Sequence, residues 1–231
     1  MASIIEISQK FLLATKLRNS TKPFIEALRG IQFDKLQNEL TSDKEKKAFW
    51  INIYNAFVQC FVINNPESYK DRKTFYRGKS IQIAGHQFSL DDIEHGILRR
   101  SKMKLALGYL NKLMVSRPEK LLRVSKVDPR IHFALNCGAK SCPPIRFYEV
   151  EKLEAQLDLA TLSYLEAEVQ IDQDENTIFL PAIFNWFRGD FNGTKGIKDF
   201  LKRYEQITGK DSLSMKFKPY DWSLHFDNFR E

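Results

Sequence analysis

The stretch from Arg130 to Tyr148, "RIHFALNCGAKSCPPIRFY", concentrates residue types that can do chemistry. It holds Cys137 and Cys142, two of the three cysteines of the chain, and His132, one of its four histidines. A cysteine becomes a nucleophile when a base lies within hydrogen-bond reach and a third group orients that base. The same residue types also occur in metal sites, in redox pairs and in ordinary cores, so the stretch poses four alternatives.

The apolar run "IHFALN" has the composition of a β-strand, and we expect a strand there followed by a turn. Successive side chains of a strand alternate between its faces, so His132 and Asn136 would share one face and Cys137 would lie on the other. Direct pairing of His132 with Cys137 would then be difficult. His95 belongs to another predicted element and is a second candidate for the base.

Cys142 precedes two prolines, Pro143 and Pro144. Proline favours the first turn of a helix, where backbone N–H groups lower the pKa of a thiol. A second proline disfavours helical angles at residue 143, which weakens that prediction. The separation of Cys137 from Cys142 is not a usual zinc or redox spacing, and few cysteines without an export signal indicate a reducing compartment rather than a permanent disulfide. We expect neither a metal nor another cofactor.

Polar residues form a stripe on a predicted apolar helix, "FWINIYNAFVQ". Asn52, Asn55 and Gln59 lie three and seven residues apart, on one face. The neighbours are almost all apolar, so the helix is buried and its carboxamides need partners. They would either brace neighbouring backbone or orient a catalytic side chain or an oxyanion. Trp50 and Tyr54 from the same helix are candidate substrate-binding residues.

A second predicted helix, "SLDDIEHGILRR", carries a histidine among carboxylates. His95 follows Asp91 by four residues and Asp92 by three, so either can pair with it, whereas the adjacent Glu94 points about 100° away. A carboxylate beside an imidazole raises its pKa and fixes its orientation. The alternative is a half-exposed helix histidine with a salt link. Glu94 stays a candidate orienting group, and Arg99 a candidate substrate-binding residue.

Two later motifs, "NWFRGDF" and "YDWSL", are rich in aromatic residues. Arg188 and Asp190 flank a glycine, which predicts a tight turn with a local ion pair. Trp186 and its aromatic neighbours are typical of a core or a pocket wall. The remaining candidate substrate-binding residues of the chain are Asn136, Cys142, Trp186 and Arg188.

The elements that must position these residues follow one another closely. We predict helices over 3–18, 22–40, 42–64, 89–100, 146–167 and 194–207, one or two helices over 103–115, hairpins over 79–90 and 169–184, and a strand near 215–217. Ser42, with Glu45 three residues later, forms a capping-box pattern at the start of the helix over 42–64, and Ala84-Gly85 marks the turn of the first hairpin. Helices with interspersed hairpins and no regular βαβ alternation indicate an α+β fold that is largely helical with short antiparallel hairpins. No repeat or linker interrupts the chain. We therefore expect one domain over 1–231, with N-terminal helices in 1–40 packing on a core of 41–225.

Composition and charge limit the classes of binding partner that the sequence favours. The net charge is +7, but the basic residues look spread along the chain and mixed with acids, with no basic run, so a nucleic-acid partner is not indicated. The chain has no stretch of 18 apolar residues, so we predict no membrane span. The first twenty residues lack the features of a signal peptide, which favours a cytoplasmic protein. The oligomeric state is not indicated by the sequence.

Five motifs together resemble one family. "FWINIYNA", "LDDIEHGILR", "DPRIHFALNCGAKSCPP", "FNWFRGDF" and "YDWSL" are similar, in this order, to the domain of unknown function DUF547, over roughly residues 40–225. The resemblance is specific for the family and implies no particular activity. Members occur in bacteria, often with export signals, and in plants behind a coiled-coil segment. The plant branch has serine at the position of Cys142, which makes Cys137 the better candidate for an essential thiol.

Two hypotheses follow. The first is a cysteine-dependent hydrolase or acyltransferase, with a papain- or transglutaminase-like arrangement as a fold-level analogy. Its residues would be Cys137 as nucleophile, His132 or His95 as base, and Asn52, Asn55, Asp91 or Glu94 as the group that orients the base. The second is a non-catalytic module that binds a small molecule or peptide, in which Cys137 is a small buried hydrophobe within a polar Asn/His/Cys cluster.

Overall fold

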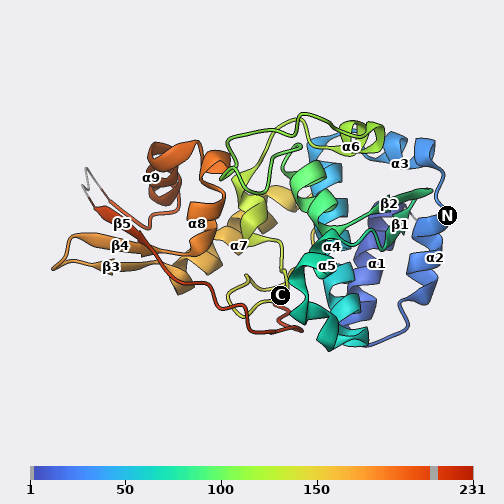
Figure 1. The fold of residues 1–231 in the computed structure, drawn as a ribbon, viewed down its shortest axis with the longest axis horizontal. Coiled ribbons are helices and arrows are strands. Elements are labelled where there is room, and N and C mark those ends of the chain that lie inside the picture. Colours follow the sequence, from blue (N-terminus) through green and yellow to red (C-terminus); the bar gives the residue numbers. More distant parts are fainter. Residues whose placement is uncertain (1–2, 209–212, 231) are drawn as a thin grey trace.

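The longest helix, α4 (Asp43–Asn64), is the centre of the helical half of the molecule (Figure 1). The computed structural model describes residues 3–208 and 213–230. The predicted capping box at the start of α4 is confirmed: the Glu45 amide donates to the Ser42 hydroxyl at 3.2 Å, and the Ser42 amide donates to the Glu45 carboxylate at 2.8 Å. Nearly every side chain from Lys47 to Cys60 is buried, as expected for a helix that is apolar nearly all round.

Three shorter helices precede α4. They are α1 (Ile4–Lys16), α2 (Lys22–Gly30) and α3 (Phe33–Glu39). Phe11 of α1 meets Phe57 of α4 edge to face, with ring centroids 4.9 Å apart. The prediction of one helix over 22–40 is wrong, because Ile31 and Gln32 adopt extended backbone angles after Gly30.

The first hairpin is confirmed, and it is followed by a π-helix. After η1 (Pro66–Lys70) and α5 (Arg72–Arg77), strands β1 (Ile81–Ile83) and β2 (His86–Phe88) pair antiparallel around Ala84 and Gly85, both with positive φ. The chain then enters the π-helix η2 (Asp92–Leu98), whose ladder bonds span five residues, as from the Arg99 amide to the Glu94 carbonyl at 2.8 Å. A π-helix often marks a functional site.

Residues 103–115 form a loop, so the helix predicted there is wrong. The backbone turns at Leu107 and Gly108, with φ of 48° and 81°, and folds back so that the Met103 amide donates to the Leu110 carbonyl at 2.8 Å. Helix α6 (Arg117–Leu122) begins only afterwards, capped by Ser116. We name residues 103–115 the cover loop.

The segment that bears His132 is a 3₁₀-helix, η3 (Pro129–Phe133), and the strand predicted there is wrong. The Asp128 carboxylate accepts from the Arg130 amide at 3.1 Å, and Pro129 presets the helical φ of the first position, so local capping overrides the strand composition. No helix begins at Pro143 or Pro144 either, and the backbone stays irregular from 143 to 149. A helix terminus therefore does not activate that thiol.

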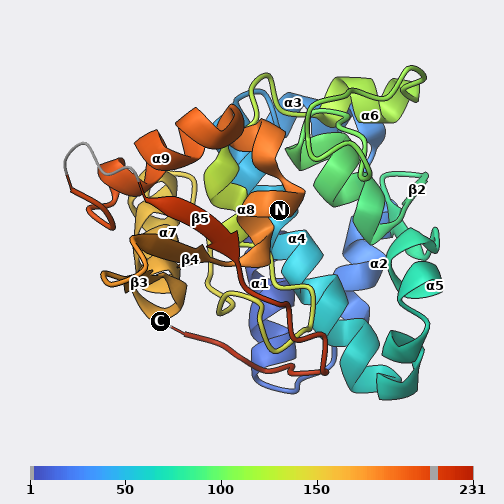
Figure 2. The same ribbon diagram turned by 60° about the vertical axis from the view of Figure 1, so that its left-hand side comes forward.

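The C-terminal half is a three-stranded sheet flanked by helices (Figure 2). Strands β3 (Gln170–Asp172) and β4 (Thr177–Leu180) form the predicted antiparallel hairpin, and β5 (Ser214–Phe217) adds parallel to β4. The helices of this half are α7 (Leu153–Glu168), which starts later than predicted, α8 (Ala182–Trp186), η4 (Arg188–Phe191) and α9 (Gly193–Arg203). Phe133 joins Phe184, Phe191 and Phe200 in its aromatic core.

The chain after β5 returns to the helical half (Figure 1). The His225 amide donates to the Gly138 carbonyl at 2.8 Å, and the Asp227 amide donates to the Gln59 side chain at 2.9 Å. Through the bond to Gly138, this tail packs against the loop that carries Cys137 and holds it in place. The α+β fold, largely helical with short antiparallel hairpins, is confirmed. The division into residues 1–40 and 41–225 stays a prediction.

Candidate functional site

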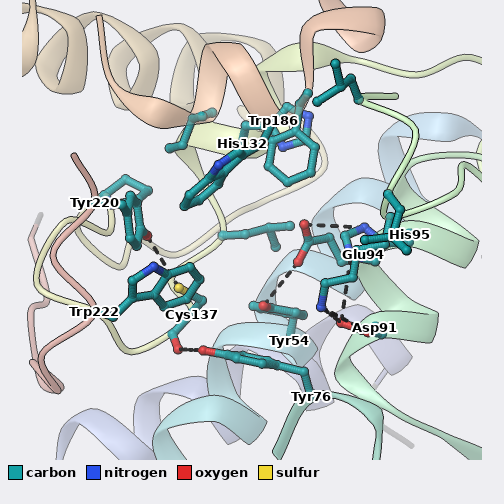
Figure 3. A pocket seen from close by; sticks show the side chains of 17 residues that line it. Tyr54, Tyr76, Asp91, Glu94, His95, His132, Cys137, Trp186, Tyr220 and Trp222 are labelled. Carbon is teal, nitrogen blue, oxygen red and sulfur yellow. Dashed lines mark hydrogen bonds and ion pairs between the residues drawn. The ribbon is translucent and has the colours of Figure 1, made fainter. Parts of the chain in front are cut away.

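A cavity of about 380 Å³ lies where the two halves and the tail meet (Figure 3). Its walls are mostly apolar, and it is large enough to enclose a small ligand. The aromatic lining residues are Tyr54, Tyr76, Trp186, Phe187, Tyr220 and Trp222. The titratable lining residues besides the tyrosines are Asp91, Glu94, His95, Lys104, His132 and Cys137.

Two sulfur atoms lie in contact at one side of the cavity. Cys137 Sγ is 2.8 Å from Cys142 Sγ, and the hydroxyl of Tyr220 lies 3.5 Å from the first and 3.2 Å from the second. Both cysteines are free thiols. Cys137 is half-buried and lines the cavity, whereas Cys142 is buried behind it.

The contact between the two sulfur atoms shifts the pKa values of the two thiols in opposite directions. The hydrogen bond from Cys142 lowers the pKa of Cys137 to about 6, against the effect of burial, with Tyr220 adding to the shift. Burial and the charge on Cys137 raise the pKa of Cys142 well above its ordinary value. Cys137 is therefore the more acidic of the two thiols and the one that loses its proton first.

His132 is held by a buried ion pair. Its Nε2 lies 2.9 Å from Asp190 Oδ2, and its ring stacks on Phe187 with centroids 4.0 Å apart. Arg99 donates to both oxygens of Asp190, at 2.5 and 3.2 Å, and the side chains of this pair are fully buried. Burial opposes ionisation of Asp190, but His132 and Arg99 outweigh it and hold its pKa below the ordinary value.

This arrangement assigns the tautomer of His132. Burial lowers the pKa of His132, although Asp190 partly offsets it, so the ring is neutral near pH 7. The Asp190 carboxylate accepts hydrogen bonds only, so Nε2 carries the proton and Nδ1 the lone pair. Within residues 3–208 and 213–230, Nδ1 has no hydrogen-bond partner.

His95 is placed differently. Arg99 Nη1 donates to His95 Nδ1 at 2.9 Å, and because arginine cannot accept, this bond occupies the lone pair of the neutral ring. Burial, reinforced by Arg99, lowers the pKa of His95 well below its ordinary value. His95 therefore lines the cavity with its basic nitrogen already engaged.

Glu94 lies beside His95, contrary to the prediction that the two point apart. Glu94 Oε1 is 3.5 Å from His95 Nδ1, and both residues belong to the π-helix. Burial raises the pKa of Glu94 to about 7, against the opposing charge of Arg99, and the hydroxyl of Tyr54 donates to it at 3.3 Å. The predicted partner Asp91 lies 3.7 Å from His95, whereas Asp92 bonds to Ser89 and Lys79.

The buried carboxamides brace backbone and do not line the cavity. Asn55 donates to the Ala134 carbonyl and accepts from the Asn136 amide, both at 2.9 Å. Asn136 in turn donates to the Pro143 carbonyl at 2.8 Å and accepts from the Gly138 amide at 2.9 Å. Together they hold the loop that carries both cysteines. Asn52 brackets residue 148 in the same way.

A sequence comparison places this cavity within a family. A family model described as "Protein of unknown function, DUF547" matches residues 38–165, more than half of the chain. The chain belongs to the DUF547 family. No curated protein and no solved structure matches it. The part that matches DUF547 includes Tyr54, Glu94, His95, His132 and Cys137, whereas the residues that complete the site, Asp190 and the cavity aromatics from Trp186 onward, lie beyond it.

The DUF547 chain brings together only some of the predicted site residues. Glu94, His95, His132, Cys137, Tyr54 and Trp186 line the cavity, whereas Asn52, Asn55, Trp50, Arg99, Asn136, Cys142 and Arg188 lie outside its lining. The predicted Arg188–Asp190 ion pair is wrong: Arg99 binds Asp190, and Arg188 donates to Asn185 at 2.7 Å.

Other lining residues gave no signal in the sequence. Tyr76 donates to the Cys137 carbonyl at 2.7 Å from α5, a helix that was not predicted. The cover loop supplies Lys104, Leu105 and Leu107. No group of three or more His, Cys, Asp or Glu side chains in the described part of the chain is placed to hold a metal ion. No described helix is long and apolar enough to cross a bilayer.

Proposed function

We propose that this protein is a cysteine-dependent hydrolase or acyltransferase with Cys137 as its nucleophile. One observation carries the proposal: the thiolate side of the cysteine pair and the His132 ring, oriented by Asp190, line the same cavity. Nucleophile, base and orienting group are the three parts that thiol catalysis needs. A reducing, cytoplasmic setting would keep the three cysteines free.

The chemistry assigns a role to each group. The Cys137 thiolate attacks an acyl carbon and forms a thioester, and the leaving group takes its proton from Glu94, whose pKa of about 7 keeps it partly protonated at neutral pH. Water then attacks the thioester and gives its proton to His132 Nδ1, which releases the thiolate. The proton on His132 finally returns to Glu94, so the cycle balances.

The test is hydrolysis of p-nitrophenyl acetate, followed by mass spectrometry of the intact protein. We expect a transient acetyl group on Cys137 and a loss of turnover of at least about 100-fold in Cys137→Ala. Cys60→Ala is the matched control, because Cys60 is buried and lies outside the cavity lining. Unchanged turnover in Cys137→Ala, with no acetylated cysteine, would overturn the proposal.

One observation favours a second candidate, a non-catalytic module that binds a small molecule or peptide. Among the described residues, the hydrogen-bond partners of Cys137 Sγ are Cys142 and Tyr220, and neither histidine is one of them. In this reading the aromatic cavity binds the ligand and the thiol packs against it. A protein that shows no acetylation but whose Cys137 is protected from iodoacetamide by a peptide or metabolite would support this candidate.

A further inference from the structure

The excess positive charge of the protein lies in one segment. The chain has 36 basic and 29 acidic residues, and the segment 100–126 contains eight of the basic and one of the acidic residues. The remaining 28 basic and 28 acidic residues cancel. The basic residues are spread along the chain as predicted, but in this segment the acidic residues that would balance them are nearly absent. This uneven distribution was hidden because no two of the eight basic residues are adjacent.

Most of these charges have no acidic partner. Lys104 pairs with Asp91 and Lys112 with Glu119. The other six, for which no ion pair with a described residue is formed, are Arg100, Lys102, Arg117, Lys120, Arg123 and Lys126. Arg100, Lys102 and Lys126 line a second cavity of about 520 Å³ on the side of the segment facing α9. Two carboxylates also line this cavity, Asp190, which pairs with Arg99, and Asp199, so the cations of the segment outnumber the acidic groups there.

The same segment exposes large apolar side chains. Leu113 and Met114 are 101% and 91% exposed, and Leu105 is 85% exposed. Five further residues share this feature: Met103, Leu107, Tyr109, Leu110 and Leu121. Large exposed apolar side chains concentrated in one segment indicate an interaction site. In Figure 1 the segment is the green stretch that crosses the upper edge of the molecule and includes α6.

We propose that residues 100–126 dock the protein on an anionic phospholipid membrane. Leucine and methionine side chains interleaved with lysine and arginine suit the interface of such a membrane, where the apolar side chains enter the acyl boundary and the cations meet phosphate groups. A second copy of the same surface would repel it, because both carry excess positive charge. A nucleic acid would satisfy the cations but would leave Leu113 and Met114 in water.

If residues 100–126 face the membrane, the mouth of the cavity that holds the candidate active site lies at the lipid surface. Lys104, Leu105 and Leu107 belong both to the docking segment and to the cavity lining. The docking itself does not depend on the proposed function. Cys137→Ala should bind membranes as the unaltered protein does, so a failure of docking and a failure of catalysis would be distinguishable.

The experiment is co-sedimentation of the full chain with phosphatidylcholine vesicles, with and without about one third phosphatidylglycerol. We expect binding to the anionic vesicles only, lost at high salt because screening weakens attraction to the surface. Leu113→Ser with Met114→Ser should weaken binding about tenfold or more, since these side chains are exposed and their loss should leave the fold intact. Arg117→Glu with Lys120→Glu should weaken it at least as much.

Matched controls carry the same changes elsewhere. Leu17→Ser with Leu159→Ser, both exposed, and Lys44→Glu with Lys73→Glu should bind anionic vesicles like the unaltered protein. Equal binding to neutral and anionic vesicles would overturn the proposal. So would full binding by the Leu113/Met114 variant, or tighter binding to a DNA duplex than to the vesicles.

Discussion

Cys137 and Cys142 titrate as one unit, because their sulfur atoms lie only 2.8 Å apart and the charge on one changes the pKa of the other. The half-buried sulfur receives the charge, and the buried sulfur keeps the proton. Such a pair needs no imidazole to form the thiolate. His132 would then serve the later step, in which water must lose a proton.

Labelling by iodoacetamide tests this coupling. The rate at Cys137 should rise with pH around a midpoint near 6, where the thiol becomes thiolate. Cys142→Ala removes the largest cause of the shift and should move the midpoint up, towards about 8.5. Mass spectrometry of each cysteine gives the profile, with Cys60→Ala as the control. An unchanged midpoint in Cys142→Ala would mean that the sulfur contact does not set the acidity.

The two histidines should differ in kinetics. His132→Asn should slow hydrolysis of the acyl-enzyme by about 100-fold or more, because it removes the free Nδ1 base, while acetylation of Cys137 persists. His95→Asn should have a smaller effect on that step, since Arg99 already occupies the lone pair of His95. Rapid mixing with p-nitrophenyl acetate separates the burst from turnover. A reversed order of the two variants would assign the base to His95.

At the scale of elements, two glycines hold the cover loop against the buried ion pair. Gly108 has a φ of +81°, and a Cβ there would lie 2.5 Å from Asp190 Oδ1. Gly189 faces it, and a Cβ on Gly189 would lie 2.5 Å from the Gly108 carbonyl carbon. The Gly189 amide donates to the Leu107 carbonyl at 2.7 Å. The cover loop can therefore pack against Asp190 and Gly189 only because neither Gly108 nor Gly189 has a side chain.

Gly108→Ala should destabilise the protein more than its backbone angle alone explains. Gly85 has a similar φ of +75° with no atom within 4 Å of its added Cβ, so Gly85→Ala isolates the cost of the angle, about 1 kcal/mol. The contact with Asp190 should bring Gly108→Ala to about 3 kcal/mol or more. Urea denaturation measures both. Equal losses would show that the loop yields without disturbing the ion pair.

The sequence predicted those elements whose signals are local. Ser42 with Glu45 marked the start of α4, and Ala84-Gly85 marked the first hairpin. It failed where two local signals competed: the strand composition of "IHFALN" was overridden by Asp128 and Pro129. The cover loop was mistaken for a helix because its structure depends on contacts with Gly189, far along the chain.

The candidate site was only partly predictable for the same reason. Cys137, His132 and Glu94 were recognisable by residue type, and each lines the cavity. The partner of His132 was not, because Asp190 lies 58 residues away and was assigned to Arg188 beside it. Residues that meet only when the two halves of the molecule pack together show no regular spacing in the sequence that would reveal the contact.

At the scale of the whole molecule, burial of Glu94 should make stability depend on pH. Folded Glu94 keeps its proton up to about pH 7, whereas the unfolded chain loses it near 4.5, so the folded state binds more protons between these values. The contribution of Glu94 to the unfolding free energy should therefore fall as pH rises through this window, while Cys137, whose folded pKa is lowered, contributes in the opposite direction. The loss should be on the order of 3 kcal/mol by pH 8.

Glu94→Gln should remove that part of the pH dependence, because the amide stays neutral. Thermal or urea unfolding at pH 5 and pH 8 measures the difference, with the exposed Glu166→Gln as control. The variant should lose less stability between the two values than the unaltered protein does. An identical slope in both proteins would show that Glu94 is ionised and solvated in the folded state.

The uneven charge also gives the molecule a permanent electric dipole. One segment of 27 residues carries the whole net charge, while the rest of the chain is neutral. Near a surface of opposite sign such a dipole experiences a torque at separations of about one Debye length, roughly 10 Å at 0.1 M salt. The protein would then be rotated before first contact, with the cover loop and the mouth of the cavity leading.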